Sequence, residues 1–112
     1  MILHNYLSNS GRDLIYEYIN SLPEAEKIDG YTVLQHMEKG EFDKILFKRW
    51  EKKVYEVYFQ KKNRVFYITV DKENIYLLHS CRKQKNKTEK KDANIVRKRA
   101  KELGNMLGRK FI

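Results

Sequence analysis

The fold of this chain is decided by residues 54–81, which read VYEVYFQKKNRVFYITVDKENIYLLHSC. Three segments of this stretch are rich in β-branched and aromatic residues, as strands are: 54–59, 64–70 and 75–81. Short polar segments that are typical of turns separate them. The stretch therefore predicts an antiparallel meander, in which the two faces of the middle strand carry Arg64, Phe66, Ile68 and Val70 on one side and Val65, Tyr67 and Thr69 on the other.

Two weaker strand signals lie outside the meander. Residues 45–47 form a candidate short strand just before it, and residues 2–7 form a candidate short edge strand near the start of the chain. We find no internal repeat and no linker. The 112 residues therefore predict a single domain over residues 1–112.

Helices are predicted on both sides of the meander. Residues 12–21 carry an apolar face at helical spacing. Ser21 and Glu24 resemble a capping box for a second helix that ends near Gly40, with expected buried residues Ala25, Ile28, Leu34 and Met37. Thr88 is expected to cap a last helix over residues 89–107, with a buried stripe of Ala93, Val96, Ala100, Leu103 and Leu107.

The charge of the chain is unevenly distributed. Residues 1–43 hold 3 basic and 8 acidic residues, whereas residues 44–112 hold 21 basic and 7 acidic ones, and the net charge of the chain is +9. Residues 82–101 alone hold ten basic residues and two acidic ones. This distribution predicts a polyanionic partner for the second part of the chain.

The residue content disfavours several classes of protein. The single cysteine, Cys81, rules out an internal disulfide and fits a reducing compartment. The first residues lack a basic leader and no stretch approaches the roughly 20 apolar residues of a membrane span, so we expect a cytoplasmic protein without membrane contact. One cysteine and three scattered histidines give no zinc spacing, and we find no glycine-rich phosphate loop, so we expect no metal and no cofactor.

What remains is a set of basic and aromatic residues on or beside the predicted strands: Tyr55, Tyr58, Arg64, Tyr67, His79, Arg82 and Lys83. They lie in four motifs, which are VYEVYF at 54–59, NRVFY at 63–67, IYLLHSCRK at 75–83 and KT at 87–88. In order and spacing these motifs resemble the RelE/ParE toxin superfamily, and most of all its phage-derived HigB-like branch. The resemblance covers roughly residues 12–105.

The resemblance implies an α+β fold in which two N-terminal helices pack on a twisted antiparallel sheet, with a C-terminal helix. It also implies the toxin of a type II toxin–antitoxin system, a ribosome-dependent, metal-independent endoribonuclease that cleaves mRNA in the ribosomal A site. The implied partners are a cognate antitoxin protein, mRNA and the 70S ribosome, and the free toxin is expected to be a monomer. Arg64, Tyr67 and Lys83 match the family's catalytic face, and Lys87 and Thr88 match its KT pair.

Three positions depart from the pattern of the branch. Tyr58 stands where arginine is usual, Cys81 where phenylalanine is usual and Glu89 where proline is usual. The missing cation at position 58 leaves open a weakened or decayed activity. It also leaves open a change of role, in which Tyr58 stacks on an RNA base.

Metal-free RNA cleavage needs a group that takes the proton of the 2′-OH, a cation for the charge on the phosphate, and a group that protonates the leaving oxygen. Arg64 suits the phosphate because its guanidinium is always ionised, and Lys83 or Arg82 can share this role. His79, with an ordinary pKa of about 6.5, is the expected proton-transfer group. Tyr67 completes the predicted catalytic set, and the predicted RNA-binding residues are Tyr58, Arg82, Lys85, Lys87, Lys98 and Lys101.

Plainer interpretations remain open at this point. Arg64 can be a solvated turn residue, His79 a core histidine, and the tyrosines ordinary sheet packing. Two other functions are also open: a ParE-like inhibitor that binds DNA gyrase without cleavage, and a basic nucleic-acid-binding module without toxicity. A gyrase inhibitor would not need Arg64 and Lys83 beside a proton-transfer group.

Overall fold

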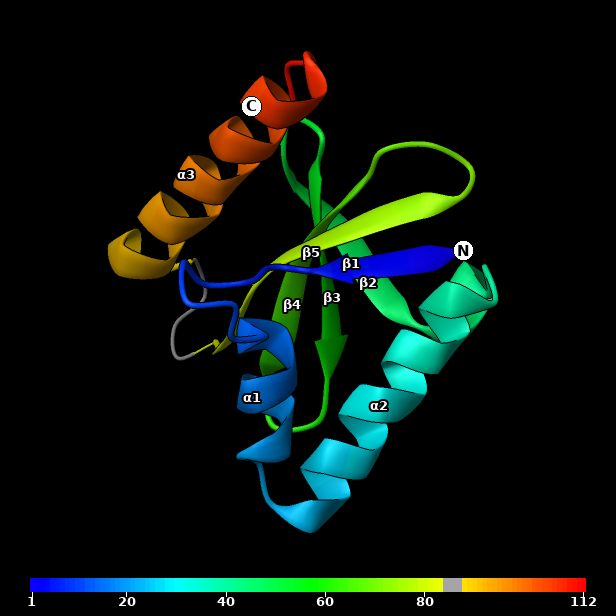
Figure 1. Cartoon of the computed structure of the whole chain (residues 1–112). Helices are drawn as coiled ribbons and strands as arrows, with labels where there is room; N and C mark the ends of the chain where they lie inside the picture. The colour runs from blue at the N-terminus through cyan, green and yellow to red at the C-terminus, as the bar shows by residue number, and fades with distance from the viewer. Residues whose placement is uncertain (84–87) are drawn as a thin grey trace.

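The predicted meander is present and is longer than predicted. The computed structural model describes residues 1–83 and 88–112. Within these residues four antiparallel strands follow one another along the chain, and they are β2 (Leu46–Glu51), β3 (Val54–Phe59), β4 (Asn63–Thr69) and β5 (Asn74–Arg82) (Figure 1). The short strand predicted at 45–47 is therefore a longer strand that forms a hairpin with β3.

The sheet is mixed, because the N-terminal strand β1 (Ile2–Asn5) pairs in parallel with β5. In the described residues the strand order is β1-β5-β4-β3-β2. The predicted edge strand is confirmed, whereas the predictions of a purely antiparallel sheet and of a fold that begins with two helices are wrong. Alternation along a strand reports which side chains are buried, but it does not report the partner strand or its direction.

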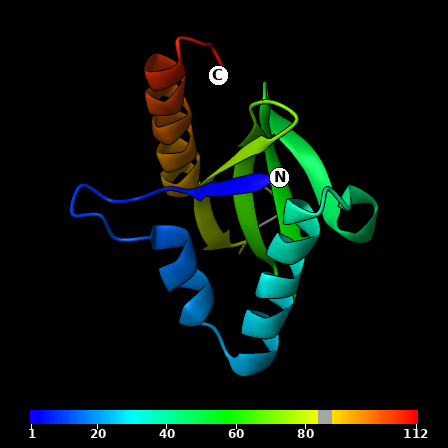
Figure 2. The ribbon, with the colours of Figure 1, turned by 45° about the vertical axis from the view of Figure 1, so that its right-hand side comes forward.

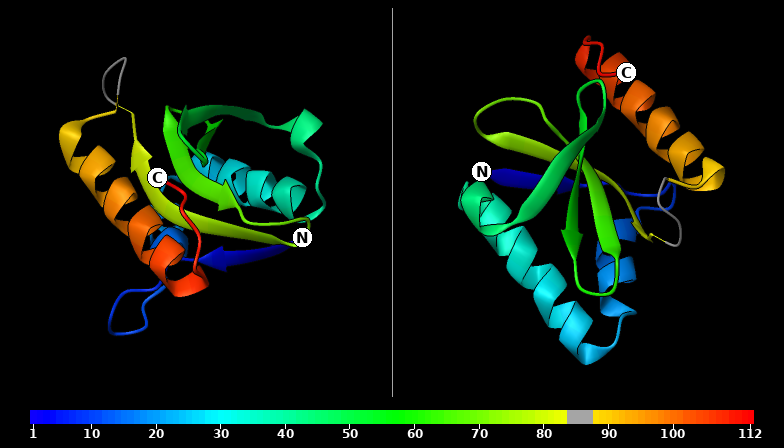
Figure 3. Two further views of the ribbon diagram at one scale, coloured as in Figure 1. Left: turned by 90° about the horizontal axis from the view of Figure 1, so that it is seen from above. Right: turned by 180° about the vertical axis from the view of Figure 1, so that it is seen from behind.

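The helices cover both faces of the sheet. The helices α1 (Leu14–Asn20) and α2 (Glu24–Glu38) lie on one face, and α3 (Lys90–Leu107) lies on the other (Figure 3). A short 3-10 helix, η1 (Phe42–Lys44), connects α2 to β2. The α+β class is confirmed. None of the helices in the described ranges is long and apolar enough to cross a membrane.

Two apolar cores follow from this layering. The core beside α1 and α2 contains Val65 and Tyr67 of β4, and the core beside α3 contains Phe66 and Ile68 of the same strand. The predicted division of β4 into two faces is therefore confirmed. The sheet is twisted, so that β1 and β3 run in crossing directions in Figures 1 and 2. The helix α3 packs mainly along β5, whereas Leu46 and Lys48 of the edge strand β2 are exposed.

The two predicted N-terminal helix caps are wrong, whereas α2 ends just before Gly40 as predicted. Ser21 Oγ donates a hydrogen bond of 2.7 Å to the carbonyl of Tyr18, and α2 begins after Pro23 without a side-chain cap. The fixed φ of proline is compatible with this start. Thr88 does not cap α3 either, because its hydroxyl accepts a hydrogen bond from Arg64, and α3 begins after Glu89.

The buried face of α2 differs from the prediction. Leu34 and Met37 are buried as predicted, whereas Ala25 and Ile28 are exposed. The helix instead presents Gly30 to the sheet, where a Cβ would lie 3.0 Å from Cε2 of Phe59. In α3 the predicted stripe is confirmed at Ala93, Val96, Ala100 and Leu103, and Leu107 is only partly buried.

Gly104 in α3 has no room for a side chain. The chain after α3 folds back over this turn, so a Cβ at position 104 would collide with the carbonyl oxygen of Arg109. We expect Gly104→Ala to lower the free energy of unfolding by about 1–3 kcal/mol, although alanine favours a helix by about 1 kcal/mol over glycine. Denaturant unfolding measures this, with the exposed neighbour Asn105→Ala as a control that changes stability by less than about 0.5 kcal/mol. Equal stability of the two variants would contradict the close packing.

Candidate active site

A cleft lies on the α3 face of the sheet, between the edge strand β2 and the segment that follows β5. Its volume is about 240 Å³, and it is lined by Lys48, Arg49, Trp50, Glu56, Arg64, Lys83 and Thr88. These residues come from three neighbouring strands and from the two described ends of the connection between β5 and α3. The cleft brings together two of the residues predicted to be catalytic, Arg64 and Lys83.

A buried ion pair forms the floor of the cleft. Arg64 Nη1 lies 3.3 Å from Glu56 Oε1 and donates a hydrogen bond of 3.0 Å to Thr88 Oγ1. The two charged side chains are each only 2% exposed. Loss of one partner from such a pair leaves an uncompensated buried charge, so each side chain fixes the position of the other.

Tyr58 and two lysines border this ion pair. The Tyr58 hydroxyl donates a short hydrogen bond to Glu56 Oε1. The ammonium groups of Lys48 and Lys83 lie 5.6 and 5.7 Å from the centroid of its ring. Burial, and then the bond to Glu56, raise the pKa of Tyr58, so the hydroxyl stays protonated at neutral pH and remains a donor.

The charges of the cleft suit a phosphodiester. Among its lining residues, Lys48, Arg49, Arg64 and Lys83 are basic and only Glu56 is acidic. Guanidinium and ammonium groups bind phosphate oxygens through charge-assisted hydrogen bonds. A carboxylate beside a bound phosphodiester is able to accept a proton. The cleft therefore combines anion binding with one potential proton acceptor.

His79 lies under α3 and does not line the cleft. Its Nε2 is 2.8 Å from Asp92 Oδ1, and its Nδ1 is 3.5 Å from Arg99 Nη1. Arg99 also donates a hydrogen bond of 2.8 Å to the carbonyl of Leu78 on β5. Both ring nitrogens of His79 therefore connect β5 to α3. The predicted proton-transfer group is thus absent from the lining of the cleft, where Glu56 is the carboxylate instead.

The burial of His79 makes the stability of the fold depend on pH. Burial lowers the pKa of His79, although the hydrogen bond to Asp92 opposes the change. The unfolded chain therefore takes up a proton at higher pH than the folded chain. This contribution to stability is fully present above about pH 6.5 and is lost as the pH falls through the folded pKa.

The measurement is the melting temperature between about pH 7.5 and about pH 5, a window that spans the ordinary histidine pKa. We expect a fall in the wild type and a smaller fall in His79→Gln, which lacks the titrating group. Equal slopes in the two proteins would contradict a lowered pKa for His79.

His79, Cys81 and Asp92 form a cluster that sequence spacing did not predict. One potential metal-ligating atom of each residue lies within 4.8 Å of the others. The guanidinium of Arg99 lies against His79, and burial raises the pKa of Cys81 to about 11, which keeps the thiol protonated. A neutral thiol and a neighbouring cation suit a hydrogen-bonded cluster better than a divalent metal ion.

Two predicted site residues lie away from the cleft. Tyr67 is 2% exposed and belongs to the core beside α1 and α2, on the opposite face of the sheet from Arg64. Arg82 donates hydrogen bonds of 2.8 Å to the Lys61 carbonyl and to Glu26 Oε1. Alternation along the strands explains both placements, because neighbouring residues point to opposite faces.

The remaining predicted RNA-binding residues have different placements. Lys98 and Lys101 are exposed on this helix and do not line the cleft. Lys85 and Lys87 lie outside the described residues. Tyr58 borders the cleft as described above, and it is the direct cross-strand partner of Arg64.

Four residues of the cleft were not predicted from the sequence: Lys48, Arg49, Trp50 and Glu56. The sequence carries a signal for Glu56, because a carboxylate at an inward position between Val54 and Tyr58 is rarely buried unless it is paired. Lys48 carries no such signal. It faces Glu56 only through the register of the β2–β3 hairpin, in which the two residues are direct partners.

The residues of the cleft fall inside a known family. Residues 17–101, more than two thirds of the chain, match the family of phage-derived Gp49-like proteins (DUF891). No match was found among curated proteins. The matched range contains all of β2 to β5 and every residue that lines the cleft. The chain therefore belongs to the phage-derived Gp49-like family.

Proposed function

We propose that this protein is the toxin of a toxin–antitoxin system and that it cleaves translated mRNA on the ribosome without a metal ion. The observation that carries the proposal is the cleft, in which the Arg64–Glu56 pair lies between Lys48 and Lys83. Membership of the Gp49-like family, a RelE-like toxin family, supports the same conclusion.

In the proposed reaction the 2′-OH of the substrate attacks the adjacent phosphorus, and the bond to the 5′ oxygen of the next nucleotide breaks. Glu56 accepts the proton of the 2′-OH. Arg64 and Lys48 stabilise the negative charge that builds up on the phosphate oxygens. The ammonium group of Lys83 donates a proton to the leaving 5′ oxygen, which leaves a cyclic phosphate on the upstream fragment.

The state of the cleft supports the proposed dependence on the ribosome. Arg64 is held by Glu56 and Thr88, so a substrate phosphate has to replace part of these contacts. A ribosome that holds mRNA in a fixed conformation supplies the alignment that a small open cleft does not. Exposed lysines of α3, such as Lys98 and Lys101, are the proposed contacts to ribosomal RNA.

The proposed regulator is a cognate antitoxin protein with an acidic segment that covers the basic cleft. The free toxin is proposed to be a monomer, and the complex a hetero-oligomer. Expression of the operon with a tag on this chain tests the partner. Purification of the tagged protein without a second, stoichiometric protein would contradict it.

The test of the proposed function compares three substrates for the purified protein: mRNA on programmed 70S ribosomes, the same mRNA alone, and DNA gyrase with a supercoiling substrate. We expect cleavage within the A-site codon on ribosomes, much slower cleavage of free mRNA, and normal supercoiling. Loss of supercoiling with intact mRNA would favour the gyrase inhibitor instead. Inertness in all three assays would favour a binding module without toxicity.

A further inference from the structure

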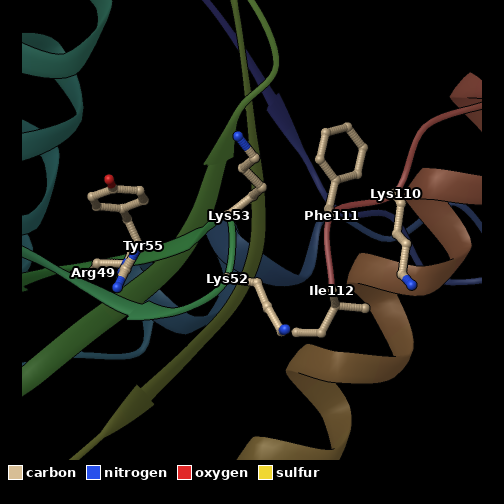
Figure 4. Close-up of a pocket in the computed structure, with 7 residues that line it drawn as sticks. All are labelled: Arg49, Lys52, Lys53, Tyr55, Lys110, Phe111 and Ile112. Carbon is tan, nitrogen blue, oxygen red and sulfur yellow. The ribbon is translucent and has the colours of Figure 1, made fainter.

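A second basic pocket lies at the β2–β3 hairpin, where the chain after α3 passes beside the turn. Its volume is about 440 Å³, and four of its lining residues are cations: Arg49, Lys52, Lys53 and Lys110. Tyr55 and Phe111 line it as well, and Figure 4 shows these two aromatic residues on opposite sides of Lys53. The backbone N–H of Lys53 donates a hydrogen bond of 3.2 Å to the Phe111 carbonyl, which fixes the tail against the hairpin.

None of the four cations of this pocket forms an ion pair in the described part of the chain. The hydrogen bond from Arg97 lowers the pKa of Glu51, and the charge of its neighbour Lys52 contributes to the same shift. The nearest carboxylate in the sequence, Glu51, is engaged by Arg97 through hydrogen bonds of 2.8 and 3.0 Å. Four free cations beside a half-buried tyrosine form a site for an anion that carries an aromatic ring.

The backbone of the hairpin gives an independent reason to assign a role to this charge. Lys52 has a φ of 53°, in the left-handed region where glycine and asparagine are the favoured residues. In the described residues every non-glycine residue with positive φ is a lysine, namely Lys52, Lys61 and Lys62. A lysine in the left-handed region makes the fold less stable than a glycine would. Such a residue is expected where the charge of its side chain has a function.

The pocket and the cleft share one lining residue, and Tyr55 enters the pocket from the side of the sheet that α1 and α2 cover. Arg49 lines both, and both lie along the edge strand β2. The geometry points to a subsite for a neighbouring nucleotide of the RNA strand that is cut in the cleft, with its phosphate among Lys52, Lys53 and Lys110 and its base against Tyr55. This inference rests on the proposed function and adds the path that the substrate follows.

The test measures the binding of fluorescein-labelled, 2′-O-methylated single-stranded RNA, which cannot be cleaved, over a range of salt concentrations. Oligonucleotides of about 2 and about 10 nucleotides distinguish the cleft alone from the cleft with its subsite, because a dinucleotide spans only the phosphodiester that is cut. The test variant is the double substitution Lys52→Gly with Lys53→Ser. The matched control is Lys39→Ala with Lys72→Ala, which removes two exposed lysines that line neither pocket.

For the longer RNA, we expect the salt slope of the test variant to be smaller than that of the wild type by about 0.7, since one phosphate contact on a single strand contributes about 0.7. The shorter RNA and the control variant should keep the wild-type slope. The melting temperature of Lys52→Gly alone should not fall, because glycine relieves the left-handed strain.

Three results would overturn the subsite: an unchanged slope in the test variant, an equal loss in the control variant, or no binding of the longer RNA by the wild type. Cleavage on programmed ribosomes decides the proposed function separately. A wild type that cleaves there but fails any of these binding criteria retains the proposed function and loses the subsite.

Discussion

Replacement of Glu56 by glutamine should lower the rate of mRNA cleavage at saturating substrate by about 10²–10⁴-fold, the range over which a general base contributes. Glutamine keeps the volume of the side chain and still accepts hydrogen bonds from Arg64 and Tyr58 through its amide oxygen. It also removes the counter-charge of the buried Arg64, so the free energy of unfolding of this variant is measured beside its activity. It cannot accept the proton of the 2′-OH. Cleavage of mRNA on programmed ribosomes under single-turnover conditions measures the effect.

The apparent affinity separates a chemical role for Glu56 from a structural one. Removal of the negative charge from the floor of the cleft should leave the binding of a phosphodiester unchanged or make it tighter, so KM should not rise. The matched control is Glu51→Gln, the same change on β2 at a carboxylate that pairs with Arg97 outside the cleft. A rise in KM without a fall in kcat would contradict the assignment of Glu56 as the base.

Arg64→Ala is a less informative variant than Glu56→Gln. Arg64 is 1% exposed, and its removal leaves Glu56 buried without a counter-charge. Loss of one partner from a buried pair destabilises a protein by about 3–5 kcal/mol, which is a large part of the stability of a small domain. A loss of activity in Arg64→Ala therefore has to be compared with the free energy of unfolding of the same variant.

Replacement of Phe66 by alanine should lower the free energy of unfolding by about 3–5 kcal/mol. Phe66 is fully buried in the core beside α3. Its ring contacts Trp50 edge-on at a centroid distance of 5.2 Å and lies 5.0 Å from the guanidinium carbon of Arg64. The cavity left by Phe66→Ala would therefore remove packing contacts both from the core beside α3 and from the floor of the cleft.

Denaturant unfolding of Phe66→Ala tests this, with Phe47→Ala as the control. Phe47 lies on the edge strand β2 and is 43% exposed, so its truncation removes less buried surface and should cost clearly less. Equal losses of stability in the two variants would contradict the burial of Phe66 in the core beside α3.

The strands and the buried stripe of α3 were predictable because they depend on local periodicity. Alternation in residues 54–81 located β3 to β5, and the division of Phe66 from Tyr67 followed from the same alternation. The parallel pairing of β1 with β5 was not predictable, since residues 2–5 and 74–77 are distant in sequence. The buried face of α2 was also set by a distant contact, that of Gly30 with Phe59.

The candidate site was predictable only in part, because some of its residues meet through contacts between strands rather than through a motif along the chain. Arg64 and Lys83 were found through motifs that lie along the chain. Glu56 and Lys48 enter the cleft through the pairing of β2 with β3, which depends on hairpin register rather than on a motif. His79 was assigned by its intrinsic chemistry, and the packing of α3 against it was not visible from its neighbours.

The most direct test of the central claim is a map of the 5′ ends of cellular mRNA after induction of the wild type, Glu56→Gln and Glu51→Gln in growing bacteria. We predict growth arrest and new ends inside translated codons for the wild type and for Glu51→Gln, and neither effect for soluble Glu56→Gln. Arrest by the wild type without new ends, or the same new ends in Glu56→Gln, would contradict a ribosome-linked nuclease with Glu56 in its active site.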